Sequence, residues 1–175
     1  YVDRNRKKDL LRQVMQDKSL SRVIVFTRTK RGANQVSEVL EKNGIKRAPI
    51  HGNKSQSARQ KALEAFKDGK IRVLVATDIA ARGIDVDNIT HVINFEVPNI
   101  AESYVHRIGR TARAGAEGIA ISFCDAEERA FIKDIEKLIG QPIPVDRTQP
   151  YHSDDVEHAR PMSKGKAKAA IESAQ

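Results

Sequence analysis

The run Arg72-Val-Leu-Val-Ala-Thr77 is the clearest strand in the sequence, because four consecutive apolar residues are closed by a polar threonine. An unbroken apolar run of this kind is typical of a strand buried on both faces of a parallel sheet. The run Arg22-Val-Ile-Val-Phe-Thr27 has the same character. Further strands are predicted at residues 47–51, 91–96 and 118–124. Pro49 makes the first of these an edge or a strand end, since proline cannot donate to a sheet ladder.

Amphipathic helices are predicted between these strands. Apolar residues follow a helical spacing over residues 4–17, 31–43, 57–67, 99–109 and 125–140. Asn99-x-x-Glu102 and Asp125-x-x-Glu128 predict the starts of two of these helices. Either Ser55 or Ser57 can cap the helix before Asp68-Gly69, and Ser57-x-x-Gln60 matches a capping box.

The alternation of strands and helices predicts an α/β fold. It implies right-handed crossovers and a mostly parallel β-sheet flanked by helices on both faces, a three-layer αβα sandwich. Ligands of such sheets bind outside the carboxyl ends of the strands. The residues after Thr27 and after Thr77 lie at such ends. We therefore expect the functional site along this edge.

The length of 175 residues suits one domain plus a tail. We expect the domain at residues 1–147. The helical and strand pattern ends near Arg147, so residues 148–175 are expected to be a flexible extension, or an ordered strap if something binds them. The run Lys164-Gly-Lys-Ala-Lys168 can start a basic tail that touches nucleic acid, although an ordinary solvated terminus fits it as well.

The net charge of +8 is unevenly distributed. Residues 28–72 hold twelve basic and four acidic side chains, whereas residues 73–150 hold eight basic and twelve acidic ones. A basic first half with 5% aromatic residues favours contact with a phosphate backbone over stacked bases. Charge alone does not exclude a domain that is merely kept soluble.

The single cysteine, Cys124, excludes an internal disulfide framework and fits a reducing cytoplasm. It lies in an apolar run, so we expect a buried small hydrophobic residue. The sequence contains no apolar run of membrane-spanning length and no signal peptide pattern. It begins at Tyr1 rather than Met, which suggests a piece of a longer protein.

Several classes of site are disfavoured by the motifs. The five histidines show no His-Glu-x-x-His or cysteine-paired spacing, so no metal site is expected. No Gly-x-Ser-x-Gly elbow, no Gly-x-x-x-x-Gly-Lys-Ser/Thr phosphate loop and no Gly-x-Gly-x-x-Gly fingerprint occurs. A complete nucleotide-phosphate site is therefore absent from this sequence.

The stretch His106-Arg-Ile-Gly-Arg-Thr-Ala-Arg-Ala-Gly115 carries three arginines at a spacing of three, Arg107, Arg110 and Arg113. A guanidinium matches phosphate geometry through two parallel hydrogen bonds and stays charged at any working pH. A solvated helix end is the alternative. We interpret the stretch as half of a phosphate site, in which Arg110 and Arg113 serve a phosphoryl group held by another domain.

Other polar residues after the strands fit the same site. Asp85 can accept from a ribose hydroxyl, and a turn-forming or capping aspartate fits equally. Thr29, Thr77 and Gly83 suit a nucleic-acid backbone. Arg59 falls in the first turn of a helix, where a cation opposes the helix dipole unless a phosphate binds there.

Together these residues resemble the C-terminal RecA-like domain of DEAD-box ATP-dependent RNA helicases. The resemblance spans about residues 20–140. In chain order, Val23-Ile-Val-Phe-Thr-Arg-Thr29 looks like motif IV, His51-Gly52 with Gln56-x-x-Arg59 like motif IVa, Ala76-Thr-Asp-Ile-Ala-Ala-Arg-Gly-Ile-Asp85 like motif V, and His106-Arg-Ile-Gly-Arg-Thr-Ala-Arg113 like motif VI. The run His51-Gly-Asn-Lys-Ser-Gln56 is similar to the bacterial RhlE type.

The resemblance implies roles for single residues. Arg110 and Arg113 would be the catalytic fingers on ATP, Gly83 and Asp85 would lie at the nucleotide, and His106 and Arg107 would couple the ATP site to RNA. The implied contacts with the backbone of single-stranded RNA are Thr29, Gly52, Arg59, Thr77 and Gly83. Ala112 departs from the glycine of many members, and we expect no loss of finger geometry.

The family's remaining motifs belong to an N-terminal RecA-like domain that this sequence lacks. The resemblance implies that this partner domain holds most of the Mg²⁺ and ATP contacts, so the chain alone should not hydrolyse ATP. A superfamily 2 DNA helicase domain and a non-enzymatic RNA-binding module remain alternatives.

Overall fold

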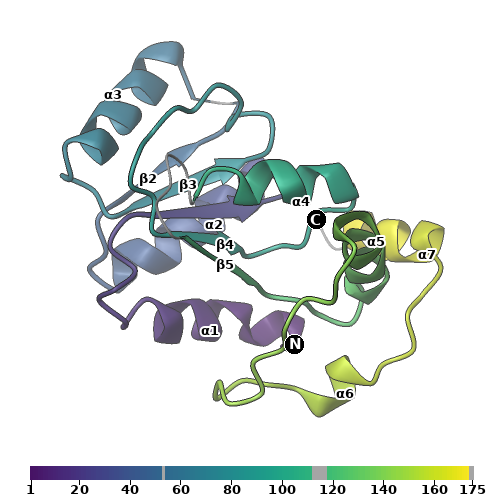
Figure 1. Ribbon diagram of the computed structural model, residues 1–175. Helices are drawn as coiled ribbons and strands as arrows, with labels where there is room; N and C mark the ends of the chain where they lie inside the picture. Colours follow the sequence, from purple (N-terminus) through teal and green to yellow (C-terminus); the bar gives the residue numbers. More distant parts are fainter. Residues whose placement is uncertain (53, 112–117, 174–175) are drawn as a thin grey trace.

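The computed structural model describes residues 1–52, 54–111 and 118–173. Its centre is a five-stranded sheet in the order β2-β3-β1-β4-β5, and all four strand pairs are parallel (Figure 1). The strands are β1 (Val23–Thr27), β2 (Arg47–Ile50), β3 (Val73–Thr77), β4 (His91–Asn94) and β5 (Ile119–Ser122). All five predicted strands are confirmed, and β2, which contains Pro49, is an edge strand as expected.

Helices cover both faces of this sheet. They are the short 3-10 helix η1 (Arg4–Arg6), α1 (Lys7–Val14), α2 (Lys30–Lys42), α3 (Gln56–Lys67), α4 (Ala101–Ile108), α5 (Arg129–Ile139), α6 (Asp154–Glu157) and α7 (Lys164–Ser173). The helix expected over residues 4–17 is shorter, because it opens with η1 and α1 ends at Val14. The predicted parallel α/β architecture is confirmed.

The strand residues alternate between two cores, which explains the unbroken apolar runs. Val23 and Val25 of β1 pack in one cluster with residues of α1 and α2. Ile24 and Phe26 pack in the other with Phe66 of α3 and the loop after β3. Since side chains alternate across a strand, both faces of β1 must be apolar when helices cover both.

The N-terminal caps of α3, α4 and α5 show which of the predicted capping residues are correct. Ser55 caps α3, because its hydroxyl accepts from the Ala58 N–H at 3.1 Å, so the capping box at Ser57 is wrong. The predicted cap at Asn99 is also wrong, since Ile100 precedes α4 and makes no side-chain cap bond. The pair before α5 is confirmed: the Glu128 N–H donates to Asp125 Oδ1 and the Asp125 N–H to Glu128 Oε1, each at 3.1 Å.

The segment after Arg147 lies against the N-terminal residues and α5 (Figure 1). Val2 forms an antiparallel bridge with His152, and the Ser153 N–H donates to the Tyr1 carbonyl at 3.1 Å. Val156 of α6 is buried, and α7 packs on α5. The boundary expected at residue 147, and the extension beyond it, stay predictions.

Cys124 is buried, as expected from its apolar run. Burial raises the pKa of its thiol above the ordinary range, so the unreactive protonated form dominates at neutral pH. Within the described ranges, no helix combines the length and apolar character needed to cross a bilayer.

Replacement of Ser55 by alanine tests the cap of α3. Ser55→Ala should lower the free energy of unfolding by about 1 kcal/mol, because the Ala58 N–H loses its acceptor. Ser57→Ala, two residues further along the chain, is the control and should change the free energy of unfolding much less. Urea unfolding followed by circular dichroism measures both, and equal losses would contradict the assignment of Ser55 as the cap.

Candidate functional site

Three of the predicted RNA-contact residues lie at the carboxyl ends of adjacent strands. Thr77 ends β3, Thr29 follows β1 by two residues and Gly52 follows β2 by two. The parallel register pairs Thr27 with Thr77 and Ile50 with Ala76, so the three strands end side by side. Thr77 is buried, Thr29 half-buried and Gly52 exposed. The structure therefore brings these three residues to one edge.

Thr29 also has a structural task. Its hydroxyl caps α2 by accepting from the Gly32 N–H at 3.0 Å, and its carbonyl accepts from Thr27 Oγ1 at 2.9 Å. The threonine is therefore held in one orientation by local hydrogen bonds.

The loop after β3 joins the nucleic-acid candidates on α3 to the rest of the edge. Arg59 Nη2 donates to the Arg82 carbonyl at 2.7 Å, which places Arg59 beside Gly83. Gly83 has φ +76°, a backbone conformation that suits glycine, and a side chain there would meet open space. The predicted residues Arg59 and Gly83 are thus neighbours, although they are far apart in sequence.

Arg110 reaches the same loop from the end of α4. Its Nη1 donates to the Ile84 carbonyl at 2.9 Å and its Nε to the His106 carbonyl at 3.3 Å. The guanidinium therefore lies next to Asp85, which is exposed. His106 is exposed on α4. Arg113 and Ala112 lie outside the described residues.

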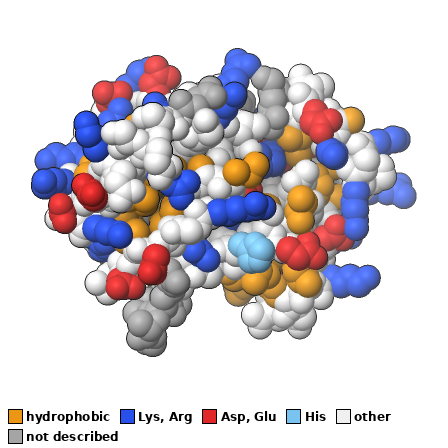
Figure 2. Space-filling view, turned by 90° about the horizontal axis from the view of Figure 1, so that it is seen from above, with side chains coloured by type: hydrophobic (Ala, Val, Ile, Leu, Met, Phe, Trp, Pro, Cys, Tyr) orange, Lys and Arg blue, Asp and Glu red, His pale blue; other side chains and the backbone are white. Residues whose placement is uncertain are grey.

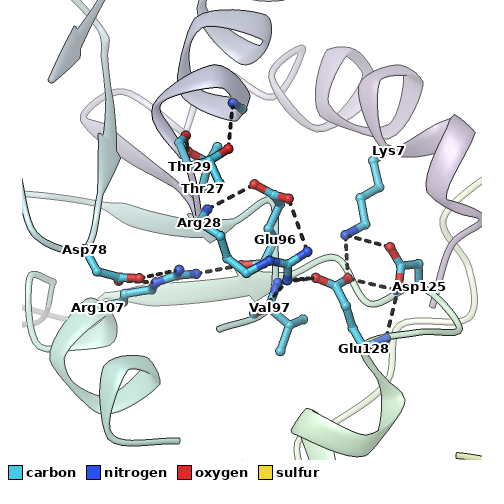
Figure 3. A network of polar contacts seen from close by, with 11 residues as sticks. Lys7, Thr27, Arg28, Thr29, Asp78, Glu96, Val97, Arg107, Asp125 and Glu128 are labelled. Carbon is cyan, nitrogen blue, oxygen red and sulfur yellow. Dashed lines mark hydrogen bonds and ion pairs between the residues drawn. The ribbon is translucent and has the colours of Figure 1, made fainter. Parts of the chain in front are cut away.

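Arg107 is fully buried, with 1% of its surface exposed. Its Nε and Nη2 donate to the two carboxylate oxygens of Asp78 at 2.6 and 2.8 Å (Figure 3). Nη1 donates to the Glu96 carbonyl at 2.6 Å, and the guanidinium lies 5.3 Å from the centre of the Phe26 ring. Arg107 therefore fixes α4 to the ends of β3 and β4. The coupling role expected for it stays a prediction.

A second polar network, not foreseen from the sequence, surrounds the fully buried Glu128. Its Oε1 accepts from Lys7 Nζ at 2.5 Å, and its Oε2 from Arg28 Nη1 at 2.6 Å and the Val97 N–H at 2.7 Å (Figure 3). Lys7 Nζ also lies 3.4 Å from Asp125 Oδ2. The network joins α1 to the segments that follow β1, β4 and β5.

Electrostatics keep the cations of this network charged. Burial alone lowers the pKa of Lys7, but the carboxylates of Glu128 and Asp125 outweigh it, so the pKa lies above its ordinary value. The pKa of Arg28 is raised in the same way, with burial opposed by Glu128 and Glu96. Both side chains are therefore cationic at neutral pH.

Glu96 links the network to the backbone before Thr29 and to the first turn of α2. Its Oε1 accepts from the Arg28 N–H at 3.0 Å, and its Oε2 from Arg28 Nη2 at 3.2 Å. A Cβ atom on Gly32 would meet Glu96 Oε1 at 2.8 Å, closer than real Cβ contacts come. Any larger residue at position 32 would therefore displace the carboxylate from the first turn of α2.

The surface at this edge is mixed in charge. Figure 2, seen from above, shows Lys and Arg side chains spread across the face from the side of α3 to the side of α7, with acidic and hydrophobic side chains between them. On the part of this face formed by described residues, the positive charge is therefore distributed over several elements.

One group of potential metal ligands lies away from this edge. His152 Nε2 is 3.2 Å from both Asp154 Oδ1 and Glu157 Oε1. Arg147 already donates to both oxygens of Glu157, at 2.9 and 3.0 Å. Hydrogen bonds and ion pairs account for this group, so it gives no reason to expect a metal ion.

The fold matches the RecA-like domains of DEAD-box proteins. The E. coli DEAD-box protein SrmB, solved bound to regulator of ribonuclease activity A, matches with a TM-score of 0.79 and 35% identity, over 87% of this chain and 92% of that chain. The C-terminal domain of the DEAD-box protein Dbp5 matches with a TM-score of 0.72 and 31% identity, over 79% of this chain and 81% of that one.

Residues 6–115 match the family described as the helicase conserved C-terminal domain, and the chain belongs to this family. Among its relatives, ATP-dependent RNA helicase DeaD of Buchnera aphidicola is 47% identical over 134 residues, which are 77% of this chain and 22% of the relative. ATP-dependent RNA helicase RhlB of Pseudomonas syringae is 45% identical over 143 residues, 82% of this chain and 36% of the relative. The chain thus spans well under half the length of these relatives.

Replacement of Arg107 tests its structural role. Arg107→Ala leaves Asp78 without its partner and removes a buried side chain, so the free energy of unfolding should fall by about 3 kcal/mol. This value is at the low end for a broken buried pair because the Asp78 side chain is 35% exposed. Arg110→Ala, which loses only bonds to carbonyls, is the control and should cost clearly less. Wild-type stability of Arg107→Ala in urea unfolding would contradict this role.

Proposed function

We propose that this chain is the second RecA-like domain of an ATP-dependent RNA helicase of the DEAD-box family. It supplies arginine fingers and RNA-backbone contacts to a composite site, and the N-terminal RecA-like domain of the same protein supplies the rest. In this proposal residues 1–147 are the helicase domain and residues 148–175 its C-terminal extension. The observation that carries the proposal is the meeting of Arg59, Gly83 and Arg110 on the loop after β3.

ATP fits the side of this loop that faces Arg110. Asp85 offers a carboxylate to a ribose hydroxyl, and Gly83 leaves room for close approach. Arg110 and Arg113 place positive charge at the phosphates, where such a finger is worth about 10³–10⁵-fold in rate. The chain offers no phosphate loop, so the partner domain holds the Mg²⁺ and most of the nucleotide. The isolated chain therefore does not hydrolyse ATP.

RNA fits the edge formed by Thr29, Gly52, Arg59, Thr77 and Gly83. Hydroxyls, an exposed glycine and a guanidinium contact phosphates and sugars without reading bases, so binding is independent of sequence. In this proposal His106 and Arg107 couple the RNA edge to the ATP side. Binding of ATP and RNA then favours closure of the two domains, which strains a bound duplex locally.

Some of the relatives support this assignment. Dbp5 of S. cerevisiae, solved bound to RNA and ADP BeF3, matches with a TM-score of 0.74 and 28% identity over 97% of this chain. A narrower assignment to the RhlE type rests on the run His51-Gly-Asn-Lys-Ser-Gln56 alone. A cytoplasmic location is part of the same proposal.

The main rival is a superfamily 2 helicase that acts on DNA. The protein carrying both domains should show ATP hydrolysis that single-stranded RNA stimulates and single-stranded DNA of the same length does not. Stimulation by DNA alone would favour the rival. Nucleic-acid binding without any ATP hydrolysis would favour a non-enzymatic RNA-binding module.

The finger assignment predicts a loss of catalytic rate. In the two-domain protein, Arg110→Ala should lower the RNA-stimulated kcat for ATP by about 10³-fold or more, because the charge on the phosphates loses its partner. Arg113→Ala should behave likewise. Arg12→Ala removes an exposed arginine at the opposite end of the strands, near Gly44 and Gly69, and serves as the control. Unchanged ATP turnover in the Arg110 and Arg113 variants would exclude the fingers.

The RNA edge predicts a separate loss. Arg59→Ala should weaken RNA binding and reduce the slope of log affinity against log salt by about 0.7, the share of one phosphate contact on a single strand. Nucleotide affinity should change little. Lys67→Ala, at the other end of α3, is the matched control. Equal losses of RNA and nucleotide affinity would mean that Arg59 acts only through the loop at Arg82.

A further inference from the structure

Helix α7 is docked on the domain through two residues one turn apart. Ala167 and Ile171 are 0% and 8% exposed and pack in a cluster that includes Val97, Tyr104 and Phe131. This i, i+4 pair gives α7 a single apolar stripe, so its rotation about its own axis is fixed. The side chains on its other faces therefore point in defined directions.

One of these side chains, Lys168, lines the same hollow as Thr29. A hollow of about 180 Å³ separates α7 from the start of α2, with Arg28, Thr29 and Asn99 on one side and Lys168 and Glu172 on the other. The residue that caps α2 at the RNA edge and a lysine of the C-terminal segment thus share one cavity, although they are far apart in sequence.

The ammonium group of Lys168 is available for a ligand. Its contact in the structure is Glu172 at 3.9 Å, and the two side chains are 61% and 62% exposed. Such an exposed pair contributes little to stability and exchanges readily for a stronger partner. Arg28, on the opposite side, is already engaged by Glu96 and Glu128. Lys168 is therefore the cation that α7 adds to this hollow.

The start of α2 is basic, whereas α7 places both Lys168 and the acidic Glu172 at the hollow. The first turn of α2 carries Lys30 and Arg31 and no acidic residue, against the preference of a helix N-terminus for negative side chains. On α7, Lys164 is held by Asp134 at 2.7 Å, which orients the start of the helix, while Lys166 is exposed. A phosphate between α2 and α7 would add a negative charge at this helix N-terminus and a partner for Lys168.

We propose that α7 forms a second wall of the RNA-binding edge, with Lys168 binding the phosphate next to the nucleotide that Thr29 contacts. The proposal rests on the proposed function, since it takes RNA as the ligand of that edge. It adds a contact from outside the residues 6–115 that match the helicase family. The C-terminal segment then extends the RNA footprint of the domain.

Binding of fluorescein-labelled single-stranded oligouridine to the 175-residue chain, followed by anisotropy, tests the proposal. Lys168→Ala should weaken binding about fivefold and reduce the salt slope by about 0.7. Lys42→Ala is the matched control, because it removes an exposed lysine from the far end of α2, twelve residues or about 18 Å from Lys30. Equal effects of the two variants would overturn the proposal.

A second variant tests whether docking of α7 is required. Ile171→Ser should release α7 from its apolar contacts and weaken RNA binding as much as Lys168→Ala does. The double variant should be no weaker than either single one, because both changes remove the same contact. Additive losses, or tighter binding after release of α7, would show that α7 does not form a wall of the site.

The outcomes distinguish this proposal from the function on which it rests. If Arg59→Ala weakens oligouridine binding and Lys168→Ala matches the Lys42 control, only the role of α7 fails. If Arg59→Ala and Lys168→Ala both bind as the unchanged chain does, the RNA edge itself is wrong.

Discussion

The carboxylate of Glu128 is the constraint on which this edge of the molecule depends. It has no exposed surface and accepts from Lys7, Arg28, Val97 and Asp125. Loss of any charged partner would leave an uncompensated buried charge, which costs several kcal/mol. The start of α1 and the segments after β1, β4 and β5 are therefore held to one another, and the residues that follow these segments have fixed positions.

Arg107 provides a second constraint, which links the strands on either side of β1. Its bonds to Asp78 and to the Glu96 carbonyl hold the end of β3 against the segment after β4. The two networks meet at Glu96, because its carbonyl accepts a hydrogen bond from Arg107 and its carboxylate accepts one from Arg28 (Figure 3). The side chains of Arg59 and Arg110 reach the loop after β3, and their hydrogen bonds to this loop go only to backbone carbonyls. The structure thus separates a buried layer of ion pairs from an outer layer that has bonding capacity for ligands.

Most of the fold could be predicted from the sequence, because each strand of a covered parallel sheet must be apolar on both faces and each helix on one. The site could be predicted as an edge, since Thr29, Thr77 and Arg110 follow strands or end a helix there. Their partners could not: Lys7 and Glu128 are 121 residues apart, and no local period marks such a pair. A signal did exist for Asp78, since a buried arginine requires a carboxylate. Asn99 failed as a cap because α4 starts two residues beyond it.

The close approach of Gly32 and Glu96 limits how this domain can evolve. A larger residue at position 32 would collide with the carboxylate, which could move aside only by giving up its hydrogen bonds from the Arg28 N–H and guanidinium. Shortening residue 96 first would free the space but leave Arg28 with one fewer acceptor. A change at either position therefore disturbs the hydrogen bonds of Arg28. We expect the effects of substitutions at the two positions to be coupled.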